Sequence, residues 1–158
     1  MVLGESSINY HRDACEIANI VNPDGYVEDF SRFEFFTSKM HEALKAKPAE
    51  NPVIISEPSI HNKDNRTKIA EILFEKIGSA CIFIAKSAVL TAYSQGKSTA
   101  LVLDSGAAHT YAVPIHEGFV LSKSTFKESF GGNTISKLIV DNLASKSVEI
   151  KPACLFEK

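Results

Sequence analysis

Apolar side chains recur every three or four residues in several parts of the chain, which is the spacing of an amphipathic helix. In residues 30–44 the repeating positions are Phe33, Phe36, Met40 and Leu44. A second run, which Gly78 ends, repeats at Ile69, Ile72, Leu73 and Ile77. A third run, after Gly131 and Gly132, repeats at Ile135, Leu138, Ile139 and Leu143. We expect these apolar faces to pack inward.

Short apolar runs between the helices predict strands over residues 53–55, 80–85 and 99–103. A short helix of small residues is expected over 87–93. Segments 110–115 and 118–121 flank a predicted turn at His116-Glu117 and should form a hairpin. Strands that alternate with helices, followed by a hairpin, indicate an α/β fold with a mixed sheet and flanking helices.

Composition and charge exclude several classes of protein. The chain has 158 residues with 17 basic and 19 acidic side chains, so a broad basic face for nucleic acid is absent. No apolar run approaches the roughly 18 residues of a membrane span. The first 20 residues lack the basic start and apolar stretch of a secretory signal. We therefore expect a soluble, intracellular protein that contacts neither nucleic acid nor membrane directly.

The cysteines and histidines favour neither a disulfide framework nor a metal centre. Cys15, Cys81 and Cys154 are far apart, which is typical of reduced thiols in or near the core. His109 and His116 are seven residues apart on predicted strand, a spacing that does not favour a metal site.

The chemistry of the chain is concentrated at Asp104-Ser105-Gly106, directly after a predicted strand. A tight turn at the end of a strand leaves backbone N–H groups free for phosphate oxygens, and Asp104 can hold a metal-bound water. An ordinary hairpin turn, with Asp104 capping local backbone, has the same sequence. The residues alone leave both interpretations open.

The surrounding sequence carries a resemblance to a known family. The chain resembles the central part of actin and the actin-related proteins through PVIISEPSIHNKDNRTKIAEILFE and AKSAVLTAYSQGKSTALVLDSGAAHTYAVPIHEGFVL. The segment GYVEDFSRFEFF resembles the family sequence just upstream. Within the family, AKSAVLTAYSQGKSTALVLDSGAAHT, Val27–Asp29 and Pro114–Leu121 are most similar to the nuclear class known as actin-related protein 4.

The resemblance implies the actin-like ATPase fold, which is related to that of ribonuclease H, present here in part. It implies a lead-in segment at 1–25, part of the first actin-like subdomain with the second phosphate loop at 26–123, and the start of the following subdomain at 124–158. By the same resemblance, Asp104 lies near Mg²⁺ and its waters. The nucleotide-binding positions that it implies are Asp104, Ser105, Gly106, Ala108, His109 and Gly132.

Departures from the family pattern predict weak or absent ATPase activity. Ser87 stands where conventional actin has the glutamine that positions the attacking water, so no catalytic residue is assigned. Alignment of the nucleophile is a main source of rate in phosphoryl transfer. Ala107 and Ala108 replace an acidic residue and a glycine of the loop, and their methyl groups crowd a phosphate.

The first phosphate loop and the adenine-binding segments of the family have no counterpart in this sequence. We therefore expect a piece of a longer protein with uncovered apolar edges. ATP and Mg²⁺ would be cofactors of the parent protein and would not bind this piece.

Three functions stay open at this point. The first is a scaffold subunit of nuclear chromatin-remodelling or histone-acetyltransferase complexes, with ATP held structurally. Its expected partners are actin, other subunits of these complexes and a long partner helix. The second is an active, filament-forming cytoskeletal actin in the cytoplasm. The third is an α/β domain whose Asp-Ser-Gly turn is only structural. Ser87 and the altered loop favour the first.

Overall fold

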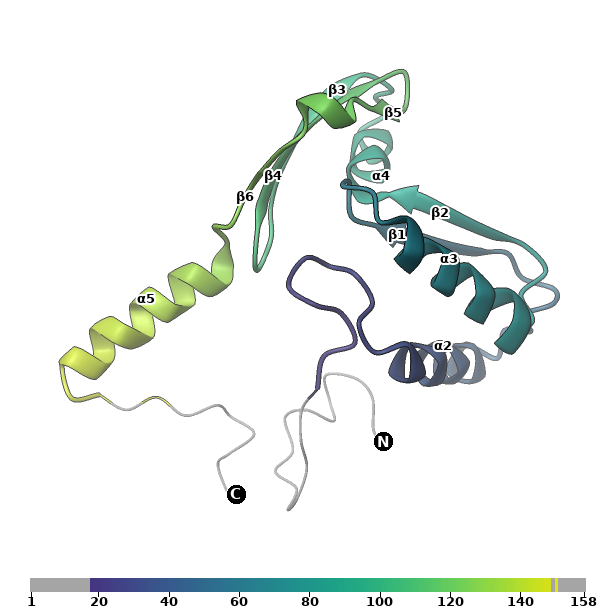
Figure 1. Ribbon diagram of the computed structural model, residues 1–158, viewed down its shortest axis with the longest axis horizontal. Coiled ribbons are helices and arrows are strands. Elements are labelled where there is room, and N and C mark those ends of the chain that lie inside the picture. Colours follow the sequence, from purple (N-terminus) through teal and green to yellow (C-terminus); the bar gives the residue numbers. More distant parts are fainter. Residues whose placement is uncertain (1–17, 149, 151–158) are drawn as a thin grey trace, which may run out of the picture.

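The computed structural model describes residues 18–148 and residue 150. Two small sheets and their helices make up the described chain (Figure 1). The first sheet pairs β1 (Val53–Glu57) with β2 (Ile82–Lys86) in parallel. The second is antiparallel, in the order β3 (Ala100–Ser105), β4 (Thr110–His116) and β5 (Phe119–Val120). The predicted α/β architecture is confirmed, with the parallel and antiparallel pairs in separate sheets rather than in one mixed sheet.

Helix α2 (Phe30–Leu44) has the predicted bounds because both of its ends are capped. Asp29 accepts a hydrogen bond from the backbone N–H of Arg32, and Lys45 ends the helix with φ 53°. Phe33 packs against the core as expected. The prediction that Met40 and Leu44 also pack inward is wrong, because these side chains are 42% and 73% exposed.

Two helical segments, α3 (Lys63–Glu71) and η1 (Ile72–Lys76), connect β1 to β2. Asn62 caps the start of α3, and η1 is a single π-helical turn in which the N–H of Ile77 donates to the carbonyl of Ile72. The turn continues the helix to the predicted end at Gly78, whose φ is +76°. Leu73, which lies in this π-helical turn, points into the core and has no exposed surface.

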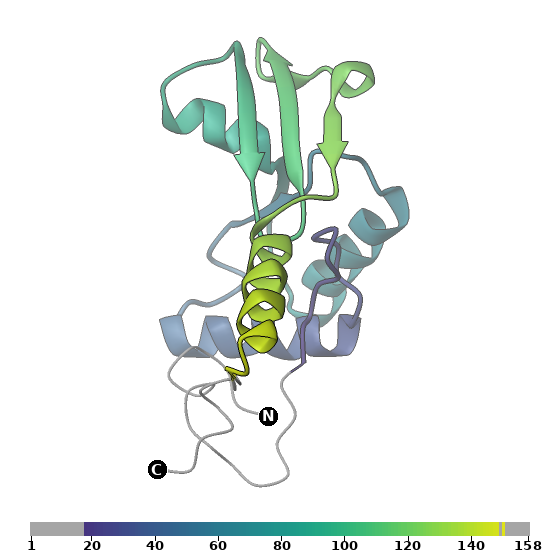
Figure 2. The ribbon, with the colours of Figure 1, turned by 90° about the vertical axis from the view of Figure 1, so that its left-hand side faces the viewer.

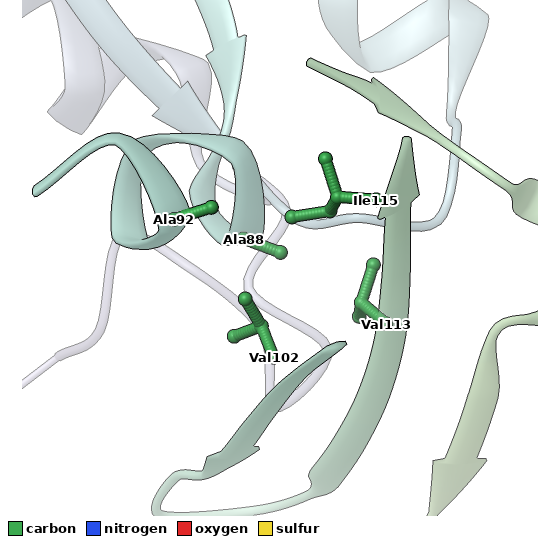
Figure 3. Packing of buried hydrophobic residues seen from close by; sticks show 5 residues of the cluster. All are labelled: Ala88, Ala92, Val102, Val113 and Ile115. Carbon is green, nitrogen blue, oxygen red and sulfur yellow. The ribbon is translucent and has the colours of Figure 1, made fainter. Parts of the chain in front are cut away.

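The described core consists of two clusters of apolar side chains. Beside the parallel sheet, Val27 and Ile84 pack with the helical Ile69 and Leu73. Beside the antiparallel sheet, small side chains of helix α4 (Ser87–Ser94) face the strands, and Figure 3 shows how the cluster members Ala88, Ala92, Val102, Val113 and Ile115 point toward one another. Helix α4 thus runs from the parallel sheet to the antiparallel one.

The antiparallel sheet contains one expected turn and one unexpected strand. Positive φ angles at Glu117 (50°) and Gly118 (82°) make the β4–β5 connection a type I′ hairpin, which confirms the predicted hairpin but places its turn one residue later than the predicted His116-Glu117. After the short 3₁₀ helix η2 (Ser122–Ser124), the unpredicted strand β6 (Phe126–Glu128) pairs with β4. The sheet therefore continues across the expected boundary between residues 123 and 124, while the division into subdomains stays a prediction.

Helix α5 (Gly132–Ser145) projects away from both sheets (Figures 1 and 2). None of its residues is buried, so the expectation that its apolar face packs inward is wrong within the described residues. Ile135, Leu138 and Ile139 are about half exposed or more. Leu101 and Leu103 on β3 are also exposed, so the sheet has an uncovered apolar face.

Two further expectations concern the cysteines and the membrane. Cys81 is free and exposed, so its expected place in or near the core is wrong. Cys15 and Cys154 lie outside the described residues. In the described ranges, no helix combines the length and apolar character that crossing a membrane requires.

We expect Leu73→Ala to lower the free energy of unfolding by about 2–5 kcal/mol, because it removes a fully buried side chain and leaves a cavity. The matched control is Leu103→Ala, since Leu103 is 74% exposed, and its effect should stay within about 0.5 kcal/mol. Urea unfolding followed by circular dichroism measures both. Equal losses in the two variants would contradict the assigned core.

Candidate phosphate-binding site

A cavity of about 510 Å³ lies where the tip of the β3–β4 hairpin meets the turn at residues 22–25 and the end of β1. Of the predicted site residues, it brings together Ser87, Asp104, Gly106, Ala108 and His109. Ser105 and Gly132 are not among the lining residues.

The hairpin that forms the cavity wall is fixed by strand pairing up to its tip. Asp104 lies opposite Tyr111, and Ser105 opposite Thr110. The hydroxyl of Ser105 hydrogen-bonds to that of Thr110 at 3.1 Å, and Thr110 donates to the carbonyl of Phe130 at 2.7 Å. The side chain of Ser105 therefore secures the hairpin, and its predicted part in nucleotide binding stays a prediction.

The loop at residues 106–109 presents backbone N–H groups, as the sequence suggested. The N–H of Gly106 donates to the carbonyl of His109 at 2.9 Å, so this amide is already occupied. The N–H groups of Ala107, Ala108 and His109 have no hydrogen-bond acceptor among the described residues. Successive free amides in a turn form an anion-binding concavity, so residues 107–109 suit a phosphate group.

The start of α5 holds this loop in place through its backbone. Its first N–H groups have no partner within the helix, and those of Gly132 and Asn133 donate to the carbonyls of Gly106 (3.0 Å) and Ala107 (2.7 Å). Gly131 approaches so closely that a Cβ atom there would lie 2.6 Å from the carbonyl oxygen of Ala107. Gly132, predicted to line the nucleoside pocket, therefore fixes the loop, and its neighbour Asn133 lines the cavity.

A buried carboxylate at the end of β1, that of Glu57, also lines the cavity. It lies 2.7 Å from the guanidinium of Arg66 and 2.9 Å from the ammonium of Lys86. Two cations offset the cost of burying one carboxylate. Asp104 has no such ion pair within the described part of the chain, so its charge faces the cavity uncompensated.

Asp24, at the turn of residues 22–25, contributes a further carboxylate. Lys127 of β6 donates a hydrogen bond to it, and Nε2 of His109 lies 2.7 Å from the same oxygen, Oδ1. Neither buried nitrogen of the His109 ring makes a hydrogen bond with the described residues. The hydrogen bond from Lys127 lowers the pKa of Asp24 and raises the pKa of Lys127.

Tyr111 completes this side of the cavity. Its ring meets that of His109 edge to face at 6.1 Å between centroids, and the ammonium of Lys127 lies 5.9 Å from its centre. Burial raises the pKa of the Tyr111 phenol, so it is neutral at physiological pH.

The sequence did not reveal Asp24, Glu57, Lys127 or Asn133 as site residues. Asp24 and Lys127 are 103 positions apart, and no local pattern signals a pairing across that distance. Asp24 lies in the sequence Pro23-Asp24-Gly25, which is typical of a turn and does not indicate a ligand.

The residues present fit the phosphate end of a magnesium nucleotide. Free amides at 107–109 suit phosphate oxygens, and the unpaired Asp104 suits contact to a metal through water. Within the described residues, no three His, Cys, Asp or Glu side chains are grouped to bind a metal ion directly.

Comparison with known proteins gives a consistent result. The family model described as Actin matches residues 1–158. Actin-related protein 4 of Arabidopsis thaliana is 31% identical over 159 residues, which cover all of this chain and 36% of that protein. Actin-related protein 4 of Oryza sativa subsp. japonica is 35% identical over 152 residues, which cover 96% of this chain and 34% of the relative. The chain thus spans about a third of the length of these curated relatives.

We expect Gly131→Ala to destabilise the protein by about 1–3 kcal/mol, because its Cβ would overlap the backbone of the 106–109 loop. The matched control is Gly132→Ala, whose Cβ would meet its nearest atoms at 3.8 Å. It should leave stability unchanged or raise it by up to about 1 kcal/mol, since alanine favours helix. Thermal unfolding gives the stability, and amide NMR shifts of Ala107 and Ala108 report the loop. Equal effects would show that the close approach does not fix the loop.

Proposed function

Because this chain belongs to the actin family, we propose that it forms the phosphate-loop region of a nuclear actin-related protein. In this proposal the protein is a scaffold subunit of chromatin-remodelling or histone-acetyltransferase assemblies. It holds ATP with Mg²⁺ as a structural ligand and hydrolyses it slowly or not at all. Actin, other subunits of the assembly and a long partner helix are its partners. The name of the relatives, actin-related protein 4, supports the nuclear class.

The observation that carries the proposal is Ser87 at the first position of α4, on the wall of the cavity. The Ser87 hydroxyl is bonded to Cβ, one carbon from the backbone. The glutamine that the family resemblance implies at this position carries its amide oxygen and nitrogen on Cδ, three carbons from the backbone. A water beyond the reach of Ser87 is not aligned for attack, and alignment is a main source of rate in phosphoryl transfer. The site therefore suits binding better than turnover.

The charge of the cavity supports the same conclusion. Its lining includes the carboxylates of Asp24, Glu57 and Asp104, and none of the described lining residues is Lys or Arg. Phosphoryl transfer depends on cations that stabilise the charge of the transferring group. Bound Mg²⁺ supplies part of this charge, and Asp104 would hold it through water. The amides of residues 107–109 would hold the phosphate oxygens.

The alternative is an active, filament-forming cytoplasmic actin. The intact Asp104-Ser105-Gly106 turn is the observation in its favour. Ser87 and the unpaired carboxylate of Asp104 weigh against it.

We expect isothermal titration of the 158-residue chain with Mg-ATP to show no binding, because half of the phosphate clamp and the adenine site would lie outside it. The matched variant Ser87→Gln restores the amide but none of those contacts, so it should bind and hydrolyse equally little. Micromolar affinity of the unaltered chain, or hydrolysis by Ser87→Gln alone, would contradict the proposal that outside residues complete the site.

We expect an affinity-tagged chain to retain remodelling or acetyltransferase subunits from nuclear extract, identified by mass spectrometry. The exposed apolar surface binds proteins non-specifically, so the destabilised Leu73→Ala chain serves as the control and should lose the specific subunits. Retention of the same proteins by both chains would contradict docking by the folded structure. Sedimentation as a polymer with Mg-ATP, without these subunits, would favour the filament-forming alternative.

A further inference from the structure

The C-terminal ends of α2 and η1 lie next to each other and enclose a second cavity of about 460 Å³. Figure 1 shows α2 beside the helical segment that contains α3 and η1. Side chains from residues 38–48 and 76–77 line this cavity, which we call the α2–η1 groove. The N–H of Ala80 donates to the carbonyl of Pro48 at 3.3 Å, so backbone joins the two sides. The groove shares no lining residue with the cavity at the hairpin tip.

Lysine ammonium groups outnumber carboxylates in the α2–η1 groove. Its lining includes Lys45, Lys47 and Lys76 and a single acidic residue, Glu42. The carboxylate of Glu42 is paired with Lys39, one turn earlier in α2. The whole chain has a formal net charge of −2, so the groove is locally positive on a slightly acidic molecule. Such a patch attracts groups of negative charge.

The charges of Lys45 and Lys76 have no partner in the described part of the chain. The ion pairs near the groove join other residues, and neither of these two lysines takes part in one. Lys47 pairs with Glu50 at 2.8 Å, but the two side chains are 75% and 64% exposed. Because an exposed pair of this kind contributes little free energy, a carboxylate of a ligand can replace that of Glu50.

The ammonium of Lys45 is not needed to end α2, because the backbone already does so. The N–H groups of Lys45 and Ala46 donate to the carbonyls of Glu42 (3.1 Å) and His41 (3.0 Å). With the positive φ of Lys45, these bonds form a Schellman motif, which satisfies the last carbonyls of the helix. The side chain of Lys45 is therefore available to a ligand.

The groove also has an apolar part beside its lysines. Ala46, Pro48 and Ile77 line it, and Ile77 packs against the core cluster beside the parallel sheet. The ring of His41 is held in the lining, because its Nδ1 donates to the carbonyl of Thr37 at 2.9 Å. Cations around an apolar surface suit a ligand that carries both carboxylates and an apolar side chain.

We propose that the α2–η1 groove binds an acidic peptide segment of a partner protein, in which carboxylates flank an apolar side chain. The carboxylates pair with Lys45, Lys47 and Lys76, and the apolar side chain contacts Pro48 and Ile77. A nucleic acid fits less well, because its phosphates need a longer track of cations than three lysines in one short groove. The inference goes beyond the proposed function, since the groove is separate from the phosphate site.

The test is a fluorescence-anisotropy titration of a labelled peptide, in which glutamates alternate with leucines, with the 158-residue chain. We expect saturable binding that weakens with salt, and Lys45→Gln and Lys76→Gln should each raise the Kd at least about threefold. Glu42→Gln should lower the Kd, because it removes the carboxylate of the lining. The control Lys137→Gln makes the same charge change as the groove variants at an exposed position of α5 and should leave the Kd unchanged.

Two other ligands test whether the groove recognises the acidic peptide. A peptide with glutamines in place of the glutamates should not bind, and equal binding would show that exposed apolar surface captures the leucines. A labelled single-stranded oligonucleotide that binds as tightly, and through the same lysines, would assign the groove to nucleic acid. Either result would overturn the proposal.

The thermal unfolding of each variant separates binding from a purely structural role of the lysines. A lower melting temperature with an unchanged Kd in Lys45→Gln and Lys76→Gln would show that these lysines only support the helix ends, and would overturn the proposal. An equal rise of the Kd in Lys137→Gln would do the same, because the effect would then come from net charge. The Mg-ATP titration does not involve this groove, so the two proposals fail separately.

Discussion

The backbone of residues 106 and 107 is held by the backbone at the start of α5, and the cavity depends on this contact. Two N–H groups of the helix donate to the loop carbonyls, while Gly131 lies too close for any side chain. Because the bonds join backbone to backbone, they do not require particular side chains in the loop. The loop therefore keeps its shape with Ala107 and Ala108, although these residues depart from the family pattern.

The electrostatics of the cavity follow from how its carboxylates are paired. Glu57 is neutralised by two cations at the end of the parallel sheet, and Asp24 by Lys127 of the antiparallel sheet. Asp104 alone is uncompensated within the described residues. The unpaired carboxylate of Asp104 and the free amides of residues 107–109 therefore lie on the same cavity.

Local signals in the sequence predicted the elements well, and contacts between distant segments poorly. The structure confirms the predicted bounds of α2 and the hairpin after β4, because caps and turns depend on neighbouring residues. β6 was missed because Phe126–Glu128 is too short to show alternation. Met40 and Leu44 were placed in the core because periodicity shows that a helix has an apolar face, without showing what covers it.

The same limit applies to the site. The Asp-Ser-Gly turn indicated the loop, and the resemblance to actin indicated its ligand. Neither could show that the Gly106 amide is occupied or that Asp24 reaches His109, because both depend on how the hairpin tip is folded against other segments.

The exposed apolar side chains of β3 and α5 also affect how the chain unfolds. Apolar groups that water already reaches in the folded state add little newly hydrated surface on unfolding. The change in heat capacity and the dependence on denaturant concentration both scale with that surface. The melting transition of this chain should therefore be broader, and its stability curve flatter, than those of a fully packed domain of equal length.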